Sequence, residues 1–275
     1  MSSSFHSPTV VLRSLSIGYR TKGSVRAVVS GMDGAIHSGE LTCLMGENGV
    51  GKSTLLRTLA GFQPPLSGAI EIAGRPLGAY TARELAQTVG VVLTEKPDAA
   101  LMTAGELVAM GRQPYTGFWG RLSADDREAV DRAIDMVGIR QLAHRQVATL
   151  SDGERQKVMI AKALAQQTDI IFLDEPTAFL DYPSKVDVLL LLRRICREGG
   201  KTVFLSTHDL ELTLQAADTI WLLTRGDGLL TGTPRHLADT GALSQFIEKG
   251  GGVTFDRQQL TVRLASMARF RPSGD

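Results

Sequence analysis

A glycine-rich segment at residues 46–53 carries residue types that can hold a phosphate chain. Its sequence, Gly-Glu-Asn-Gly-Val-Gly-Lys-Ser, fits the spacing G-x-x-x-x-G-K-[ST]. The glycines let backbone N–H groups turn inward around phosphate oxygens, the ammonium of Lys52 can bind the β- and γ-phosphates, and the hydroxyl of Ser53 can ligate Mg²⁺. The segment therefore predicts that ATP and Mg²⁺ bind here. The expected nucleotide contacts are Gly46, Glu47, Asn48, Gly49, Val50, Gly51, Lys52, Ser53 and Thr54.

Two adjacent carboxylates, Asp174 and Glu175, follow the apolar segment Ile170–Leu173. A buried strand that ends in two acids can place one of them on Mg²⁺ and the next on an attacking water molecule. We assign Asp174 to the metal and Glu175 to the water. Acids that merely decorate an exposed strand end are a common alternative for one Asp, but a poor one for two adjoining acids followed by Pro176.

Two further segments could contact phosphate. His208 follows the apolar segment Thr202–Ser206, so its imidazole is predicted at the carboxyl end of a buried strand, where ligands bind in parallel sheets. Together with Lys52 and Glu175, it is a candidate catalytic residue. The segment Leu150–Gln156 opens a predicted helix, and its Ser and Glu at a spacing of three form a capping box. A phosphate held by the free N–H groups of that helix is the competing interpretation.

The elements around these residues predict an α/β fold. Leu41–Met45 reads as a strand that enters the glycine-rich loop and then the helix Thr54–Ala60, which is the order of a parallel α/β unit. Short alternating segments from Thr9 to Leu44 and at Ser67–Ile72 predict an antiparallel β subdomain. Helix-forming segments between about 95 and 150 predict an inserted helical subdomain. The chain therefore divides into a disordered tail (1–8), a main domain (9–250) and a C-terminal extension (251–275) whose role the sequence does not indicate.

Composition narrows the functional class. Lys and Arg total 30 and Asp and Glu total 29, so no net positive field favours a nucleic-acid partner. The two cysteines, Cys43 and Cys196, have no metal-ligand spacing and are expected to be reduced thiols. The N-terminus lacks a secretory pattern, and no apolar run approaches the roughly 20 residues that span a bilayer. Any membrane contact is therefore expected through a partner.

Taken together, these motifs resemble the ABC ATPase family, a class of P-loop NTPase, from about Val10 to the region of Pro234. The resemblance implies that Leu150–Gln156 is the signature motif, whose Ser151 and Gly153 complete the ATP site of the opposite subunit in a homodimer. It also implies that Tyr19 stacks on adenine, that Leu180–Asp181 crosses the dimer as the D-loop, and that His208 contacts the γ-phosphate.

Two departures from the family pattern bear on the site. The signature reads S-D-G-E where the commonest form has S-G-G-Q, and this places Asp152 and Glu154 near a polyanion. We expect both carboxylates to point away and to favour the helix dipole instead. Thr94 stands where the family usually carries a glutamine that reaches Mg²⁺ and water. Whether Thr94, Glu95 or water takes that role stays open, and our hypothesis keeps Glu95 away from the metal.

The helical insert carries a cue to the subfamily. Glu106–Arg112 with Pro114–Tyr115 is similar to ATPases that serve importers of ferric siderophores, haem and cobalamin. We favour an iron complex as cargo, with cobalamin or haem as alternatives and a separate exporter subunit as the competing class. ABC ATPases acting on DNA or ribosomes usually carry two cassettes or a long coiled coil, and this chain has one P-loop and no sustained heptads.

The importer assignment implies a set of partners and a location. These are a second copy of the chain, integral membrane permease subunits and, indirectly, an extracytoplasmic substrate-binding protein. The expected location is the cytoplasmic face of the inner (plasma) membrane, with peripheral attachment. A groove near Thr94 and the helical insert is expected to receive the permease's cytoplasmic helices.

Overall fold

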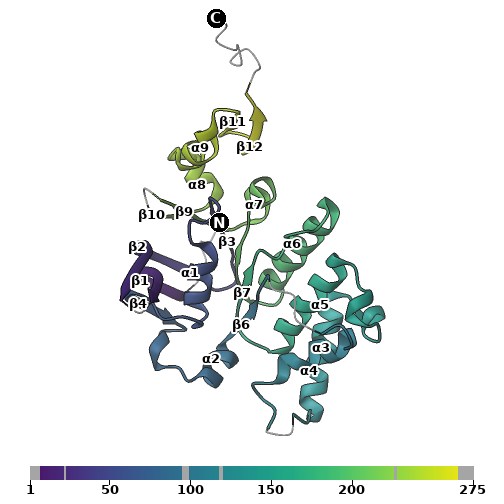
Figure 1. Cartoon of the computed structure of the whole chain (residues 1–275). Helices are drawn as coiled ribbons and strands as arrows, with labels where there is room; N and C mark the ends of the chain where they lie inside the picture. Colours follow the sequence, from purple (N-terminus) through teal and green to yellow (C-terminus); the bar gives the residue numbers. More distant parts are fainter. Residues whose placement is uncertain (1–6, 22, 95–98, 118–119, 226–227, 266–275) are drawn as a thin grey trace, which may run out of the picture.

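The computed structural model describes residues 7–21, 23–94, 99–117, 120–225 and 228–265. They form a mostly parallel sheet, an antiparallel sheet, a helical layer and a C-terminal extension that stacks above the parallel sheet (Figure 1). Residues 1–6 of the expected disordered tail lie outside the described residues, as do residues 266–275 of the extension. Strand β1 (Pro8–Thr21) already includes Pro8, so the expected tail ends before that residue.

The larger sheet consists of β3 (Leu41–Gly46), β6 (Val89–Val92), β7 (Ile170–Asp174), β8 (Thr202–Ser206), β9 (Thr219–Thr224) and β10 (Gly228–Gly232). Their order is β10-β9-β3-β8-β7-β6, and only β10 runs antiparallel to its neighbour. Every residue of β3, β7 and β8 is buried, as expected for parallel strands that are covered on both faces. The carboxyl ends of these strands therefore meet at one edge of the sheet.

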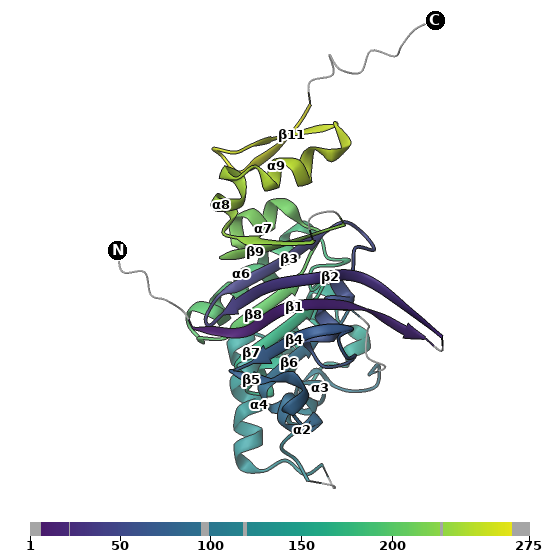
Figure 2. The same ribbon diagram turned by 90° about the vertical axis from the view of Figure 1, so that its left-hand side faces the viewer.

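The antiparallel sheet has the order β2-β1-β4-β5, with β2 (Ser24–His37), β4 (Ser67–Ile72) and β5 (Arg75–Pro76). In Figure 2 it lies in front of the parallel sheet. Helix α1 (Lys52–Leu59) shares one buried cluster with both sheets, in which the aromatic rings of Phe172, Phe204 and Trp221 meet edge to face. A Cβ at Gly34 would lie 3.1 Å from the indole of Trp221, so the absence of a side chain there lets β2 approach this ring.

The helical layer shares one buried cluster with the other face of the parallel sheet and contacts it through α5 at β6. It contains α3 (Ala104–Ala109), the 3₁₀ turn η2 (Met110–Arg112), α4 (Ala124–Val137) and α5 (Asp152–Ala165). Capping boxes start α3, α4 and α5, and Gly138 ends α4 in the left-handed conformation with φ 74°. Helix α5 packs against both α3 and α4, so the helical layer continues past residue 150. Residues Arg140–Leu142 form the 3₁₀ turn η3.

Helices α6 (Tyr182–Arg197) and α7 (Leu210–Ala216) pack on the same face of the parallel sheet, against β3 and β8. The other helical segments are η1 (Leu77–Ala79), α2 (Ala82–Thr88) and η4 (Val147–Thr149). Both cysteines are buried and free, and burial raises the pKa of the Cys196 thiol to about 12, which keeps it protonated. None of the helices among the described residues is both long and apolar enough to cross a membrane.

The C-terminal part of the chain forms a separate small layer that begins at Pro234, before position 251, where the sequence placed the start of the extension. Residues 234–265 are called the C-terminal extension from here on. It contains α8 (Pro234–Asp239), α9 (Ala242–Ile247), η5 (Glu248–Gly250) and the hairpin of β11 (Val253–Asp256) and β12 (Thr261–Leu264). Its buried residues Leu237, Leu243 and Phe255 form one cluster with Met45 of β3 and Leu214 of α7. The extension is thus packed onto the strand that leads into the glycine-rich loop.

Candidate functional site

The segment Gly46–Ser53, called the P-loop from here on, connects β3 to α1. Gly49 and Gly51 have φ values of 72° and 115°, which L side chains rarely adopt. A Cβ at Gly46 would lie 2.6 Å from the carbonyl oxygen of Leu223, so only glycine allows β9 to approach the start of the loop. The sequence therefore folds into a tight loop that precedes the N-terminus of α1, the arrangement that binds phosphate.

The ammonium of Lys52 lies inside this loop. It donates to the carbonyl oxygens of Gly46 at 2.9 Å and Glu47 at 3.2 Å, and it lies 3.5 Å from Nδ1 of His208. The residue is 5% exposed. Burial lowers the pKa of Lys52, and the nearby carboxylates of Glu175 and Asp174 oppose that shift. Lys52 is therefore held where a phosphate chain wrapped by the loop would meet it.

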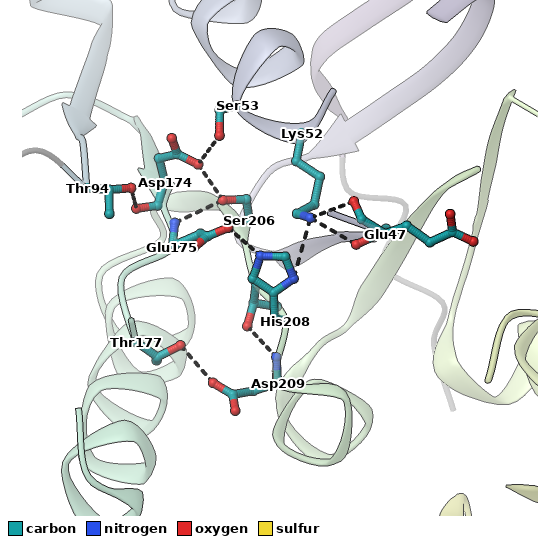
Figure 3. Close-up of polar contacts among 12 residues, drawn as sticks. Glu47, Lys52, Ser53, Thr94, Asp174, Glu175, Thr177, Ser206, His208 and Asp209 are labelled. Atoms are coloured by element: carbon teal, nitrogen blue, oxygen red, sulfur yellow. Dashed lines mark hydrogen bonds and ion pairs between the residues drawn. The ribbon is translucent and has the colours of Figure 1, made fainter. Parts of the chain in front are cut away.

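The acidic pair lies near the P-loop because β7 pairs in parallel with β8, and β8 pairs in parallel with β3 (Figure 3). Asp174 accepts a hydrogen bond from the hydroxyl of Ser53 at 3.2 Å and from the hydroxyl of Ser206 at 2.6 Å. The same Ser206 hydroxyl accepts from the backbone N–H of Glu175 at 2.9 Å. Sequence reasoning did not single out Ser206, although its place at the end of β8 is the signal that could have done so.

His208 and Glu175 meet directly. The distance between Nε2 of His208 and Oε1 of Glu175 is 2.5 Å. Glu175 has a φ of 49°, in the left-handed region that is unfavourable for an L side chain. Such strain at a strand end is a common feature of functional sites, and here it accompanies a carboxylate that faces the P-loop lysine and the histidine.

A cavity of about 300 Å³ is lined by Lys52, Glu175 and His208. Tyr19, with half of its surface exposed, contributes to the wall, and its hydroxyl lies 2.8 Å from that of Thr54. Arg26 pairs with Tyr19 across β1 and β2. Sequence reasoning missed Arg26, because the sequence of one strand does not show which residues of the next strand lie opposite it. The lining residues are Tyr19, Arg26, Val28, Asn48, Gly49, Gly51, Lys52, Ser53, Thr54, Glu175 and His208.

The residues beside the cavity fit Mg²⁺. The hydroxyl of Ser53 and a carboxylate oxygen of Asp174 are 3.2 Å apart, close enough to share one ion. Among the described residues no group of three or more His, Cys, Asp or Glu could hold a metal. Mg²⁺ in ATP sites takes one or two protein oxygens and completes its shell with phosphate oxygens and water. The donor set therefore matches a metal that arrives with nucleotide.

Thr94 lies near the acidic pair, but its hydroxyl is bonded to the main chain. It donates to the carbonyl oxygen of Asp174 at 2.8 Å. This bond ties the end of β6 to the end of β7 (Figure 3). Glu95, the other residue considered for the role of the family's glutamine, lies outside the described residues.

The signature segment begins α5 and is not part of the cavity. Ser151 and Gly153 are not among the described residues that line it. Ser151 and Glu154 form a capping box, in which the hydroxyl of Ser151 accepts a hydrogen bond from the N–H of Glu154. Arg145 donates to the Glu154 carboxylate at 3.2 Å. Arg155 donates to Asp152 at 3.0 Å. The carboxylate of Glu154 thus contacts the helix start and Arg145, and that of Asp152 contacts Arg155.

The D-loop segment lies between β7 and α6. The carboxylate of Asp181 accepts from the N–H of Ser184 at 3.1 Å and thereby starts α6, and these hydrogen bonds lower the pKa of Asp181. Phe179, two residues earlier, is 81% exposed and has a φ of 64°. The segment thus presents an apolar ring to solvent beside the acidic pair.

Known proteins share this sequence pattern. Residues 29–178 match the profile of a family described as ABC transporter. The chain is 37% identical over 235 residues to the achromobactin transport ATP-binding protein CbrD of Dickeya dadantii, covering 84% of each chain. It is 32% identical over 243 residues to the iron(3+)-hydroxamate import ATP-binding protein FhuC of Bacillus subtilis, covering 88% of each.

Solved structures share the fold. A dimeric post-hydrolysis state of the ATP-binding cassette MJ0796, bound to ADP and Pi, matches with a TM-score of 0.70 at 27% identity. The match covers 82% of this chain and 98% of that one. The expected fold class, with its parallel sheet, antiparallel β subdomain and helical layer, is confirmed. With its P-loop, acidic strand end and adjacent histidine, this chain belongs to the ABC transporter family as an ATP-hydrolysing, ATP-binding subunit.

Proposed function

We propose that this chain powers an importer of ferric siderophores or a related iron chelate by hydrolysing Mg-ATP. The cargo class is supported by sequence similarity. The chain is at least 32% identical, over at least 84% of its length, to subunits named for achromobactin transport and iron(3+)-hydroxamate import. These names favour an importer over an exporter, and an iron chelate over cobalamin or haem. The site geometry supports the hydrolysis itself.

In the proposed reaction the P-loop N–H groups and Lys52 hold the phosphates. Ser53 and Asp174 would hold Mg²⁺, which would supply positive charge to stabilise the phosphate oxygens. Glu175 accepts a proton from water as the water oxygen attacks the γ-phosphorus, and the bond from that phosphorus to the β-phosphate oxygen breaks. His208, 2.5 Å from Glu175 and 3.5 Å from Lys52, orients the carboxylate and contacts the γ-phosphate. The ring of Tyr19 stacks on adenine.

The active form is proposed to be a homodimer with two ATP molecules at its interface. Ser151 and Gly153 start a helix whose N–H groups can bind phosphate, yet they do not line the chain's own cavity. A second copy of the chain can bring them to the γ-phosphate. The dimeric arrangement of the structurally similar cassette supports this assembly. Closure with ATP and opening after hydrolysis would then move the membrane partners.

The proposed membrane partner is an integral permease subunit, which would receive substrate from an extracytoplasmic binding protein. A cavity of about 360 Å³ lies between the end of α1, α2 and the helical layer. Apolar side chains including Phe62, Leu85 and Met110 line it, and Phe62 is 58% exposed. We assign this groove to a cytoplasmic helix of the permease. The groove reaches Val91 of β6 but not Thr94, the residue named from the sequence. The chain would thus attach at the cytoplasmic face of the plasma membrane.

The proposed function is tested with Glu175→Gln protein, which should bind ATP, fail to hydrolyse it and accumulate as a dimer. Light scattering after gel filtration with Mg-ATP measures the dimer. Tagged Glu175→Gln protein, retrieved from native membranes with ATP, should carry a polytopic permease and an iron-chelate binding protein. An exporter permease in the retrieved complex would contradict the importer assignment.

Matched controls separate the parts of the proposal. Lys52→Ala removes the phosphate contact and should abolish dimer formation by Glu175→Gln protein. Lys201→Met removes an ion pair with Asp169 at the opposite end of the parallel strands and should leave dimerisation unchanged. If both substitutions had the same effect, the P-loop would not be the nucleotide site.

A further inference from the structure

The C-terminal extension reaches the P-loop through one ion pair. The ammonium of Lys249, in η5, lies 3.0 Å from Oε1 of Glu47, although the two residues are 202 positions apart in the sequence. Glu47 is the second residue of the P-loop. Its carbonyl oxygen faces Lys52, whereas its carboxylate points away from Lys52 and the acidic pair (Figure 3). The ion pair therefore lies on the outer side of the loop.

Lys249 is held in place by the packing of the extension. Glu248, its neighbour, accepts a hydrogen bond from the N–H of Phe255 at 2.8 Å, which ties η5 to β11. Phe255 is 7% exposed and belongs to the buried cluster that contains Met45, the residue before the P-loop. The extension is thus docked on the same strand that presents Glu47, so both partners of the ion pair have defined positions.

The charge of Glu47 is unfavourable for the proposed ligand. A carboxylate in a loop that wraps a triphosphate repels it, and the repulsion acts over several ångströms. The hydrogen bond and the charge of Lys249, with a smaller contribution from Arg225, hold the pKa of Glu47 below its ordinary value. Glu47 therefore stays ionised at neutral pH, and its charge must be offset by neighbouring cations rather than by protonation.

We infer that Lys249 is a positioning residue for nucleotide binding, which holds the Glu47 carboxylate away from the triphosphate and offsets its charge. The C-terminal extension thereby raises the affinity of the P-loop for ATP by a modest factor. This inference rests on the proposed placement of the triphosphate in the P-loop. Both side chains are about half exposed, at 51% for Lys249 and 44% for Glu47, so water screens the interaction and the effect is modest.

The test is a double-mutant cycle on the full chain, read as equilibrium binding of a fluorescent ATP analogue with Mg²⁺. Lys249→Met should weaken binding about two- to fivefold, the range of an exposed ion pair. Glu47→Gln should strengthen binding modestly, because the amide no longer repels the triphosphate. The double variant should recover the affinity that Lys249→Met loses. The loss in Lys249→Met should shrink at about 0.5 M salt, where screening is strong.

Two outcomes would overturn the inference. If Lys249→Met bound ATP like wild type, the ion pair would not affect the site. If the double variant bound as weakly as Lys249→Met, the lysine would act through the fold or by touching the phosphates. Thermal unfolding of each variant distinguishes a loss of folding from a loss of binding.

The failure of the proposed function would look different. Lys52→Ala should lose ATP binding whatever residue stands at position 249. Full binding by Lys52→Ala would refute the placement of the triphosphate, whereas the double-mutant cycle addresses Lys249 alone. Lys201→Met, which removes the ion pair of Lys201 with Asp169 at the far end of the sheet, is the matched lysine control and should bind ATP like wild type.

Discussion

The imidazole Nε2 of His208 lies 2.5 Å from a carboxylate oxygen of Glu175, while its Nδ1 lies 3.5 Å from the ammonium of Lys52. One side chain thus contacts both the proposed base and the P-loop lysine. The contacts arise because the loops that follow β3, β7 and β8 emerge at the same edge of the parallel sheet. The arrangement predicts that loss of this histidine affects the chemical step more than nucleotide binding.

We expect His208→Ala to lower kcat by about 100-fold or more, the usual contribution of a group that assists proton transfer. Binding should change little, because the P-loop N–H groups and Lys52 remain. ATPase rates and the affinity for ATP, measured on the same preparation, give the comparison. His144→Ala, in the helical layer, is the control and should retain the wild-type rate. Equal losses of affinity and rate would contradict the proposed role.

Ser206 is expected to position both acids. Its hydroxyl donates to Asp174 at 2.6 Å, accepts from the N–H of Glu175 at 2.9 Å and is fully buried. Ser206→Ala should lower kcat by about 10- to 100-fold, because a hydrogen bond to a charged group contributes about 1.5–3 kcal/mol. It should also raise the Mg²⁺ concentration needed for half-maximal rate.

A control for Ser206 lies in the same strand. Thr202 is equally buried but stands at the opposite end of β8. Thr202→Ala should therefore affect stability without a change in the Mg²⁺ requirement. If the two alanine variants shared one kinetic profile, the effect of Ser206→Ala would reflect the packing of β8 alone.

Tyr19 is expected to supply stacking rather than a hydrogen bond. Its exposed ring can lie against a base, and its hydroxyl contacts that of Thr54. Tyr19→Ala should weaken ATP binding by about 1–3 kcal/mol, the usual contribution of a stacked base, and Tyr19→Phe should keep most of the affinity. Isothermal titration measures both. Inorganic tripolyphosphate has no base, so its affinity should be the same for all three proteins.

The helical layer contains a buried ion pair that should make stability depend on acid. Arg112 donates to Asp126 at 2.9 Å and to the carbonyl oxygen of Ala165 at 2.8 Å. Hydrogen bonds from Ser123, together with Arg112, lower the pKa of Asp126 to about 2. Because the folded pKa is depressed, the ionised carboxylate stabilises the fold above its unfolded pKa of about 4. That contribution is lost as the pH falls towards 2.

We expect Arg112→Ala to destabilise the protein by about 3 kcal/mol, because it leaves a buried carboxylate without its partner. Asp126→Asn should remove part of the decline in stability between pH 4 and 2. The free energy of unfolding in urea, measured at several pH values, tests both. Asp131→Asn breaks an exposed ion pair with Arg140 and serves as the control with little effect.

Local sequence predicted much of the site. The P-loop and the apolar strands that end in Asp174 and precede His208 are short segments whose residue types carry their own geometry. Glycine at positions 49 and 51 specifies the left-handed backbone, and β-branched apolar runs specify buried strands. The helix expected at Thr54–Ala60 spans Lys52–Leu59.

Tertiary structure decided which residues from distant segments meet at the site. The sequence by itself determined the P-loop, the acidic strand end, the signature helix and the family, since each depends on residues close together in the chain. The positions of Arg26, Ser206 and Lys249 were decided by strand register, by the pairing of β7 with β8, and by the packing of the extension on Met45. Such contacts join residues far apart in the chain. The burial of apolar surface between elements determines these contacts, and it leaves no pattern in the local sequence.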